Sequence, residues 1–385
     1  MRALRLYAGP TAFQHLQQHG LQPRDVRVIP AAAGGPKGLI LGRMDRFLFG
    51  DWLRTSAHTI HLVGASIGAW RMATACLKDP LQGFDRLEQE YIFQHYDLPP
   101  GRKMPTPDTI SAVFGGNLRA FYAGREDEVL QHPCFKLHII TSRGRHLLAR
   151  DQALRTPLGF LGAYVANALR RKTMGAWLER VVFSSQHARL PFRSRDYPTR
   201  QVDLTAQNLV PALLASCSIP FVLRAVHDIP GAPPGAYWDG GLTDYHLHLQ
   251  YLRPKIAMQK IASHADGISV EGLNGAKNPA AATAGLVLYP HFQKAVVPGW
   301  LDKRLTWRHK SSSFLDNMLV LAPNPEWVTT LPNGKLPDRA DFRHYGLDLP
   351  ARAKAWTGAI AASQQLADEF AQWLQRPDMG QVHPL

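Results

Sequence analysis

Two apolar runs near the start of the chain are each followed by a glycine-rich turn and a helix-prone segment. Residues 26–31 precede the turn AGGPKG at 33–38, and residues 39–48 then have helical periodicity. Residues 61–63 precede the turn GASIG at 64–68, which opens a second helix-prone segment. A strand, a glycine turn and a helix repeated in this order predict a βαβ unit and therefore a parallel sheet.

The composition is that of a large folded domain. The chain has 385 residues, of which 45% are hydrophobic and 19% are charged, enough to bury the core of one oversized α/β domain or of a domain with a cap. Its first residues lack the apolar core of a secretory signal, and no apolar stretch reaches the ~18 residues of a membrane span. We therefore expect a cytoplasmic protein, with peripheral membrane association as an alternative. The three cysteines, Cys76, Cys134 and Cys217, predict reduced thiols rather than a disulfide framework.

The chain is strongly basic, with a formal net charge of +14. A surface of this sign attracts polyanions, whether lipid head groups or nucleic acid. No recognised DNA- or RNA-binding motif organises the arginines and lysines, so we do not expect a nucleic-acid partner. We expect a solvated basic surface, and peripheral contact with an anionic membrane surface is the alternative. The oligomeric state stays open.

The remaining segments differ in character. Residues 84–128 read as short helical pieces broken by prolines between 99 and 105, which predicts a lid or cap. Residues 255–284 are rich in Ala, Gly, Asn and Ser, which predicts an insertion or a surface loop. We assign residues 1–330 to a catalytic domain and 331–385 to a helical extension packed on it. Further strands are predicted at 135–140, 181–183 and 285–289, a strand or short helix at 314–321, and the last helix at 354–374.

Residues 156–179 predict an amphipathic helix that carries basic residues at 170–172. We expect this helix to pack on the core with a basic outer face. The alternative is a helix that docks on the edge of a bilayer.

Ser66 stands in the middle of GASIG, the pattern of a nucleophile elbow between a strand and a helix. A serine hydroxyl becomes a good nucleophile only when a base accepts its proton and donors stabilise the oxyanion. The loop at 33–38 fits neither the Walker nor the dinucleotide pattern, and its glycines let amides point into a cleft beside the elbow. Asp239, in the motif WDGG, can lie in a tight turn within reach of Ser66 as the general base.

These three elements, together with ALLASCSIPF at 212–221, resemble the patatin-like phospholipase family over residues 26–244. The resemblance implies an α/β fold whose central, mainly parallel sheet is flanked by helices. It implies Ser66 as nucleophile and Asp239 as base. The oxyanion hole would come from Gly34, Gly35, Lys37 and Gly38, with Gly64, Gly68, Gly240 and Gly241 supporting the turns. Two departures are Ala33, where the family often has a third glycine, and Pro36, which donates no N–H.

The function that this resemblance implies is hydrolysis of carboxylic ester bonds of lipids, of the phospholipase A type, through an acyl-enzyme. We expect no metal and no organic cofactor. Two alternatives stay open: a catalytically idle lipid- or membrane-binding scaffold, and an esterase with a Ser-His-Asp triad that uses His246, His248 or His291. A metal at His246 and His248 is not expected, because no nearby cluster of Cys, Asp or Glu completes a site, although Asp244 is close in the sequence.

Overall fold

The computed structural model describes residues 1–96, 105–251 and 285–385. Its centre is one mixed sheet in the order β11-β1-β10-β9-β2-β3-β4-β5-β6, with β8 paired to β4 and β7 paired to β8. The central neighbours β10, β9, β2, β3 and β4 are all parallel, whereas β1–β10 and β4–β5 pair antiparallel. The strands are β1 Leu4–Ala8, β2 Val26–Ala31, β3 Ile60–Ala65, β4 Phe135–Gly144, β5 Leu178–Ser184, β6 Thr199–Asp203, β7 Val226–His227, β8 Ala236–Asp239, β9 Leu286–Pro290, β10 Met318–Pro323 and β11 Val382–Pro384.

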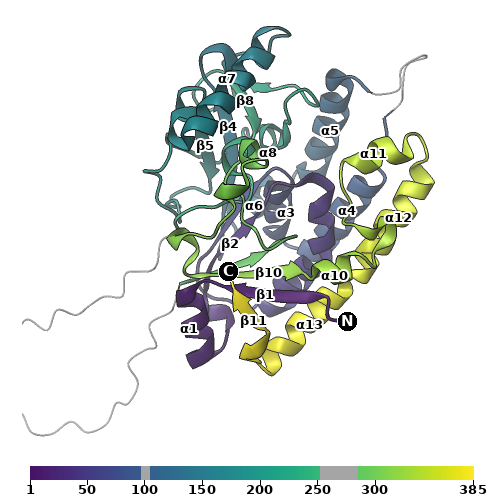
Figure 1. Ribbon diagram of the computed structural model, residues 1–385. Helices are drawn as coiled ribbons and strands as arrows, with labels where there is room; N and C mark the ends of the chain where they lie inside the picture. Colours follow the sequence, from purple (N-terminus) through teal and green to yellow (C-terminus); the bar gives the residue numbers. More distant parts are fainter. Residues whose placement is uncertain (97–104, 252–284) are drawn as a thin grey trace, which may run out of the picture.

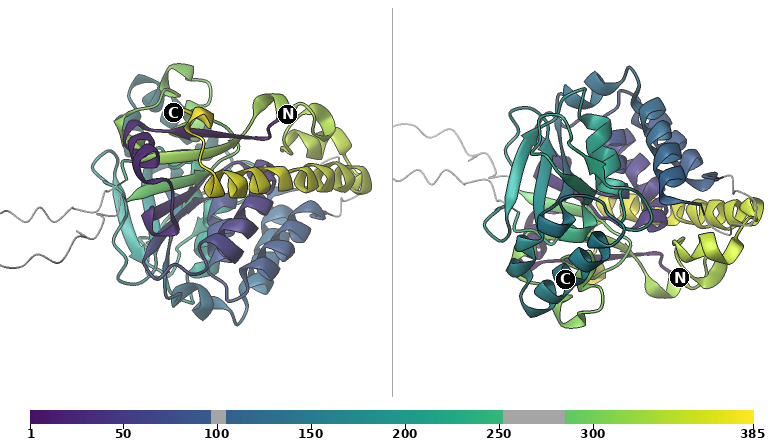
Figure 2. Two further views of the ribbon diagram at one scale, coloured as in Figure 1. Left: turned by 90° about the horizontal axis from the view of Figure 1, so that it is seen from below. Right: turned by 90° about the horizontal axis from the view of Figure 1, so that it is seen from above.

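Helices cover both faces of this sheet (Figures 1 and 2). α2, α3, α4 and α13 pack together on one face, and α1 and α7 lie on the other side. The predicted α/β class with a mainly parallel sheet is therefore confirmed. The α-helices are α1 Pro10–His19, α2 Gly42–Phe47, α3 Ile67–Ala75, α4 Pro80–Ile92, α5 Pro107–Tyr122, α6 Glu126–Leu130, α7 Arg155–Leu169, α8 Leu209–Cys217, α9 Gly241–Asp244, α10 Pro325–Val328, α11 Ala340–Tyr345, α12 Leu349–Ala362 and α13 Gln364–Gln375.

The central strands are apolar along their whole length because both of their faces are covered. β3, β9 and β10 expose almost nothing, as expected for parallel strands between two helical layers. β2 and β3 are neighbours and run in the same direction. Their carboxyl ends therefore bring the two glycine turns of the sequence to one edge of the sheet.

Two predicted helices differ from the observed ones. The segment predicted as one helix over 354–374 is divided at Ser363 between α12 and α13. The helix predicted over 156–179 ends at Leu169, because Arg170 takes an extended conformation and a short 3-10 helix and β5 follow. The proline-rich part of the predicted lid, over 99–104, and the predicted insertion at 255–284 lie outside the described residues.

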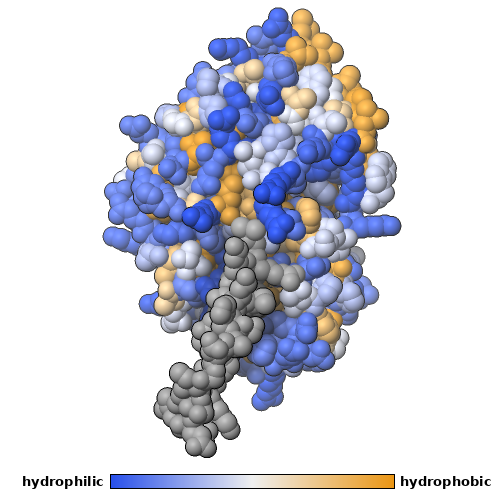
Figure 3. Space-filling view, turned by 90° about the vertical axis from the view of Figure 1, so that its left-hand side faces the viewer, coloured by the Kyte–Doolittle hydropathy of each residue, from blue (hydrophilic) through white to orange (hydrophobic). Residues whose placement is uncertain are grey.

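The early end of α7 changes its outer face. Arg170 and Lys172 lie beyond the helix, so the predicted basic outer face is wrong. The outward residues are instead apolar: Leu158, Leu161 and Leu169 are 59%, 58% and 83% exposed. Orange atoms gather along the upper edge in Figure 3, the part of the molecule where α7 lies in Figure 1.

Candidate active site

Ser66 occupies the single residue between β3 and α3. Its φ of 56° and ψ of −130° lie in a region that residues with side chains rarely adopt, a strain typical of functional turns. The flanking glycines are required by close packing: a Cβ atom on Gly64 would lie 2.4 Å from the Cα atom of Ala69, and one on Gly68 would lie 1.9 Å from the carbonyl oxygen of Ala31. The GASIG pattern therefore marks the place where β3, α3 and β2 pack so closely that a side chain larger than that of glycine does not fit at positions 64 and 68.

Ser66 and Asp239 are hydrogen-bonded to each other. Ser66 Oγ donates to Asp239 Oδ2 over 2.8 Å, and the amide of Gly241 donates to Asp239 Oδ1 over 2.7 Å. Both side chains are buried. Burial raises the pKa of Asp239, and the nearby positive charge of Arg339 opposes this shift. The carboxylate is therefore held at the serine and is more basic than an exposed aspartate.

The end of α8 holds the two residues in register. Ser216 Oγ accepts a hydrogen bond from the Ser66 amide over 2.9 Å and donates one to the Ile140 carbonyl over 2.7 Å. The amides of Asp239 and Gly240 donate to the carbonyls of Ser218 and Ser216. This segment lies within the ALLASCSIPF stretch, whose sequence gave no role for Ser216.

The two glycines after Asp239 permit close approach of the turn. A Cβ atom on Gly240 would lie 2.1 Å from the carbonyl oxygen of Ile140, and one on Gly241 would lie 2.7 Å from the Cβ atom of Ala33. The Asp-Gly-Gly turn is therefore packed between β4 and the glycine loop that follows β2.

The glycine loop begins a 3-10 helix at Gly35. In such a helix the amides from the third residue onward donate to carbonyls three residues earlier, which occupies the amides of Lys37 and Gly38. Gly38 also packs against Ile67, since a Cβ atom there would lie 3.1 Å from that side chain. Gly34 and Gly35 are the loop amides left over. Gly35, with a φ of +58°, faces the same cavity as Ser66.

A family match covers the segments that form this geometry. Residues 33–246, more than half of the chain, match the family model for Patatin-like phospholipase. The chain belongs to the patatin-like phospholipase family. This is a family of lipid acyl hydrolases, and the match includes the glycine loop, the elbow and the Asp-Gly-Gly turn. No curated protein matches the chain.

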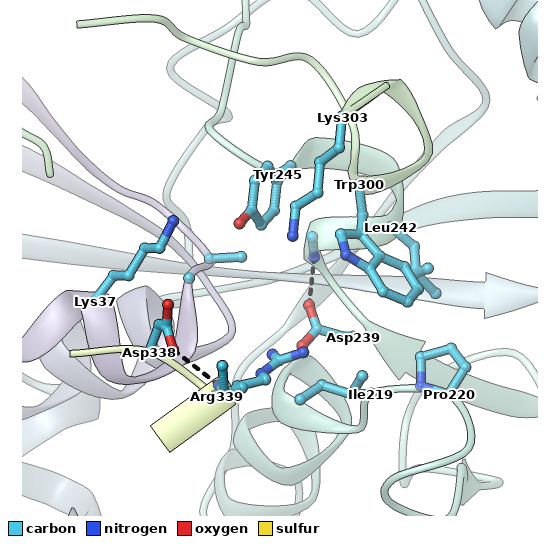
Figure 4. A pocket seen from close by; sticks show the side chains of 14 residues that line it. Lys37, Ile219, Pro220, Asp239, Leu242, Tyr245, Trp300, Lys303, Asp338 and Arg339 are labelled. Carbon is cyan, nitrogen blue, oxygen red and sulfur yellow. Dashed lines mark hydrogen bonds between the residues drawn. The ribbon is translucent and has the colours of Figure 1, made fainter. Parts of the chain in front are cut away.

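Two cavities meet beside Ser66 and Asp239 in this patatin-like domain, and both are lined by Ile219 and Arg339. The larger, of about 320 Å³, contains Ser66 and is mostly apolar and aromatic. The smaller, of about 230 Å³, contains Asp239 and is lined by charged side chains. Figure 4 shows the smaller cavity, with the Arg339 guanidinium beside the Asp239 carboxylate.

Arg339 lies outside the part of the chain that matches the family. The turn before α11 positions it through Asp341, whose carboxylate accepts hydrogen bonds from Lys335, from the Asp338 amide and from Trp356 Nε1. The sequence offered no signal for Arg339, because it belongs to no motif and reaches Asp239 only through tertiary packing.

The three histidines of the alternative triad are engaged elsewhere. The ring of His246 hydrogen-bonds to the Ala295 carbonyl and that of His248 to the Val296 carbonyl, so both pin their loop to the segment before Gly299. Burial lowers the pKa of His291 to about 3, and its ring hydrogen-bonds to the Gln293 carbonyl. Within the described residues, none of the three hydrogen-bonds to Ser66 or Asp239. The described part of the chain also contains no group of three or more His, Cys, Asp or Glu side chains placed to hold a metal ion.

Asp244 has a structural role in the buried core. Its carboxylate accepts two hydrogen bonds from Arg180, over 2.7 and 2.6 Å. Because both groups are buried and paired, Asp244 is not available to Ser66 despite its closeness in sequence to Asp239.

In the described residues, no helix is both long and apolar enough to span a membrane.

Proposed function

We propose that this protein is a serine acyl hydrolase that cleaves carboxylic ester bonds of lipids through the dyad of Ser66 and Asp239. The observation that carries the proposal is the 2.8 Å hydrogen bond from Ser66 Oγ to the buried Asp239 carboxylate. A serine on a strained turn, with a carboxylate of raised pKa as its acceptor, has the geometry and the basicity that proton abstraction needs.

The reaction proceeds in two halves. Ser66 Oγ attacks the acyl carbon and its proton passes to Asp239, which then protonates the departing alkoxide as the ester bond breaks. Asp239 next takes a proton from water, whose oxygen attacks the acyl-enzyme. The fatty acid leaves, and the proton returns to Ser66 Oγ.

Three amides near Ser66 are suited to hold the oxyanion. Gly34 and Gly35 precede the hydrogen-bonded part of their 3-10 helix, and Ile67 is the first residue of α3, where the amide has no partner within the helix. Gly35 and Ile67 both line the cavity of Ser66. The backbone amides of Lys37 and Gly38 are then used inside the 3-10 helix, so these two residues support the loop and do not donate hydrogen bonds to the oxyanion.

The larger cavity suits an acyl chain. Trp70, Ile110, Phe114 and Leu223 line it together with Ser66, so a chain bonded to the serine would lie against apolar side chains. Val222 and Leu347 also line it and are 40% and 71% exposed. The cavity therefore opens at an apolar rim.

We propose further that this rim meets the surface of an anionic bilayer. The exposed apolar stripe of α7 adjoins it, because Phe160 of α7 contacts the exposed Phe221 at a ring distance of 5.8 Å. Arg155 begins α7, and Arg170 and Lys172 follow its end, all of them exposed. An apolar helix face with basic residues at its ends is the pattern of an interfacial helix.

A lipid panel tests the hydrolase. Wild-type protein and Ser66→Ala are incubated with phospholipid, lysophospholipid and monoacylglycerol, and released fatty acid is measured by mass spectrometry. We expect release by the wild type and none above background by the variant. Equal release by both would overturn the proposal, and vesicle binding without turnover by the wild type would identify an idle scaffold.

Vesicle flotation tests the bilayer contact. The double substitution Leu158→Gln and Leu161→Gln should reduce binding to phosphatidylglycerol vesicles about tenfold, because two apolar side chains no longer enter the interface. Leu81→Gln is the matched control, an exposed leucine at the start of α4. Equal binding by all three proteins would contradict the proposed surface.

A further inference from the structure

The smaller cavity gathers three cationic side chains from distant parts of the chain. Lys37 comes from the glycine loop, Lys303 from the segment after Trp300, and Arg339 from the turn before α11. In Figure 4, Lys37 and Lys303 extend toward the space beside Tyr245, and Arg339 lies beside Asp239. Lys303 and Arg339 lie outside the part of the chain that matches the family.

Two carboxylates line the cavity beside these cations, and both are engaged with other groups. Among the described residues, none of the three forms a salt bridge, whereas Asp338 at the cavity wall is paired with Lys335 over 2.7 Å. Asp239 is the one other carboxylate in the lining, and it holds Ser66 and the Gly241 amide. The cavity therefore carries an excess of positive charge.

The cations also lie close enough to repel one another. Lys303 is exposed as a whole residue, but its pKa is lowered to about 8, first by partial burial of its ammonium group in the cavity and then by the positive charges of Arg339 and Lys37. Asp239 acts in the opposite direction. An anion placed among these three groups would relieve the repulsion.

The two aromatic residues that line the cavity, Tyr245 and Trp300, already have a protein cation over their rings. Lys303 Nζ lies 4.2 Å from the centre of the Tyr245 ring and 5.6 Å from that of Trp300. A quaternary ammonium head group binds by stacking on such faces. Choline would therefore meet positive charge where it needs an open ring.

The position of Asp239 assigns each cavity to one side of the ester. Asp239 must reach the departing oxygen to protonate it, so the alcohol part of the substrate lies on the Asp239 side. The acyl part, bonded to Ser66, lies in the apolar cavity. The charged cavity is thus next to the head group.

We propose that this cavity binds the phosphate of an anionic glycerolipid head group through Lys37, Lys303 and Arg339, and that the protein prefers such esters to choline-bearing and uncharged ones. The inference rests on the proposed function, because the head-group side is defined by the roles of Ser66 and Asp239.

Kinetics with three lipids of one acyl chain test the preference. Lysophosphatidic acid, lysophosphatidylcholine and monoacylglycerol are compared in mixed micelles of uncharged detergent. We expect kcat/KM of the wild type to be about tenfold higher for lysophosphatidic acid than for either other lipid, and Lys303→Gln to bring the ratio near one. Arg304→Gln, an exposed neighbour outside the cavity lining, should keep the wild-type ratio. A wild-type ratio near one, or an equal fall in both Lys303→Gln and Arg304→Gln, would overturn the proposal.

A binding measurement separates this inference from the hydrolase proposal. Glycerol 3-phosphate and inorganic phosphate are titrated calorimetrically into Ser66→Ala, with and without Lys303→Gln. We expect glycerol 3-phosphate to bind Ser66→Ala and to lose about tenfold in affinity in the double variant. Tighter binding of glycerol 3-phosphate than of phosphate assigns the site to a head group, whereas equal binding would reduce it to a general phosphate site and overturn the head-group assignment. Binding of glycerol 3-phosphate, together with no ester hydrolysis by the wild type, would overturn the hydrolase proposal and leave the cavity as an anion-binding site.

Discussion

The two cavities beside the dyad differ in origin as well as in polarity. The apolar cavity takes most of its lining from the part of the chain that matches the family, including α3, α5 and the segment after α8, and the rest from residues between Arg339 and Arg352. The charged cavity depends on Lys303 and Arg339, which come from the last third of the chain. The difference teaches that segments outside the family match contribute to both cavities, and that they supply two of the three cations of the charged one, Lys303 and Arg339.

Removing the proposed base, Asp239, should lower the rate of ester hydrolysis more than any substitution other than that of Ser66. Proton transfer from Ser66 depends on this carboxylate for every ester, whichever groups fill the two cavities. Asp239→Asn keeps the shape of the side chain but cannot accept the Ser66 proton, so we expect kcat for a short neutral ester to fall by about 10³-fold. Asp203→Asn, at an exposed strand residue, is the matched control. Steady-state kinetics would contradict the dyad if the two variants were equally active.

Filling the apolar cavity with a larger side chain should test its role independently of the charged cavity. Ile110 lines this cavity, while Val113 on the same helix is exposed and does not. Ile110→Trp should lower kcat/KM for a palmitoyl ester at least about tenfold relative to a butyryl ester, because the long chain loses its space. Val113→Trp should keep the wild-type ratio. A chain-length profile that is unchanged in Ile110→Trp would place the acyl chain elsewhere.

Ser216 tests whether the end of α8 positions the dyad. Ser216→Ala leaves the Ser66 amide without an acceptor and the Ile140 carbonyl without a donor in a fully buried place. We expect a loss of about 1–3 kcal/mol in the free energy of unfolding and a fall in kcat with little change in KM. Ser216→Cys, of similar volume, should recover part of kcat. Denaturant unfolding and kinetics measure both, and a loss of stability with full kcat would limit Ser216 to a structural role.

The smallest expected effect is a shift in the pH dependence of kcat/KM. Asp239 must be unprotonated to act, and burial raises its pKa, so kcat/KM for a neutral ester should fall with decreasing pH at values above those of an ordinary aspartate. Arg339 lowers this pKa through its charge. Arg339→Gln should therefore move the acidic limb to higher pH. A limb that stays in place or moves to lower pH would show that Arg339 does not act on Asp239.

How much of the site the sequence predicts depends on how local each contact is. The elbow and the Asp-Gly-Gly turn were predictable, because a Cβ atom on Gly68 or Gly240 would lie less than 2.5 Å from a carbonyl oxygen of a neighbouring strand, so both positions require glycine. The pairing of Ser66 with Asp239 needed the family resemblance as well, since β8 reaches the elbow only by pairing with β4.

The residues that the sequence could not predict act through packing between distant segments. Arg339 and Lys303 meet at the charged cavity only after α11 and the segment near Trp300 have packed on the domain. The predicted basic outer face of α7 is wrong because the sequence pattern extends the helix over residues 170–172. The extended backbone of Arg170 ends the helix earlier, so the leucine stripe became the exposed face.

Covalent labelling tests the central claim most directly. Wild-type protein, Ser66→Ala and Asp239→Asn are treated with a fluorophosphonate, which reacts with activated serines, and the modified peptide is identified by mass spectrometry. The account predicts one modification at Ser66 in the wild type, none in Ser66→Ala and labelling of Asp239→Asn slowed by about 10²-fold or more. Labelling of another residue, or equal labelling rates in the wild type and Asp239→Asn, would contradict a serine activated by Asp239.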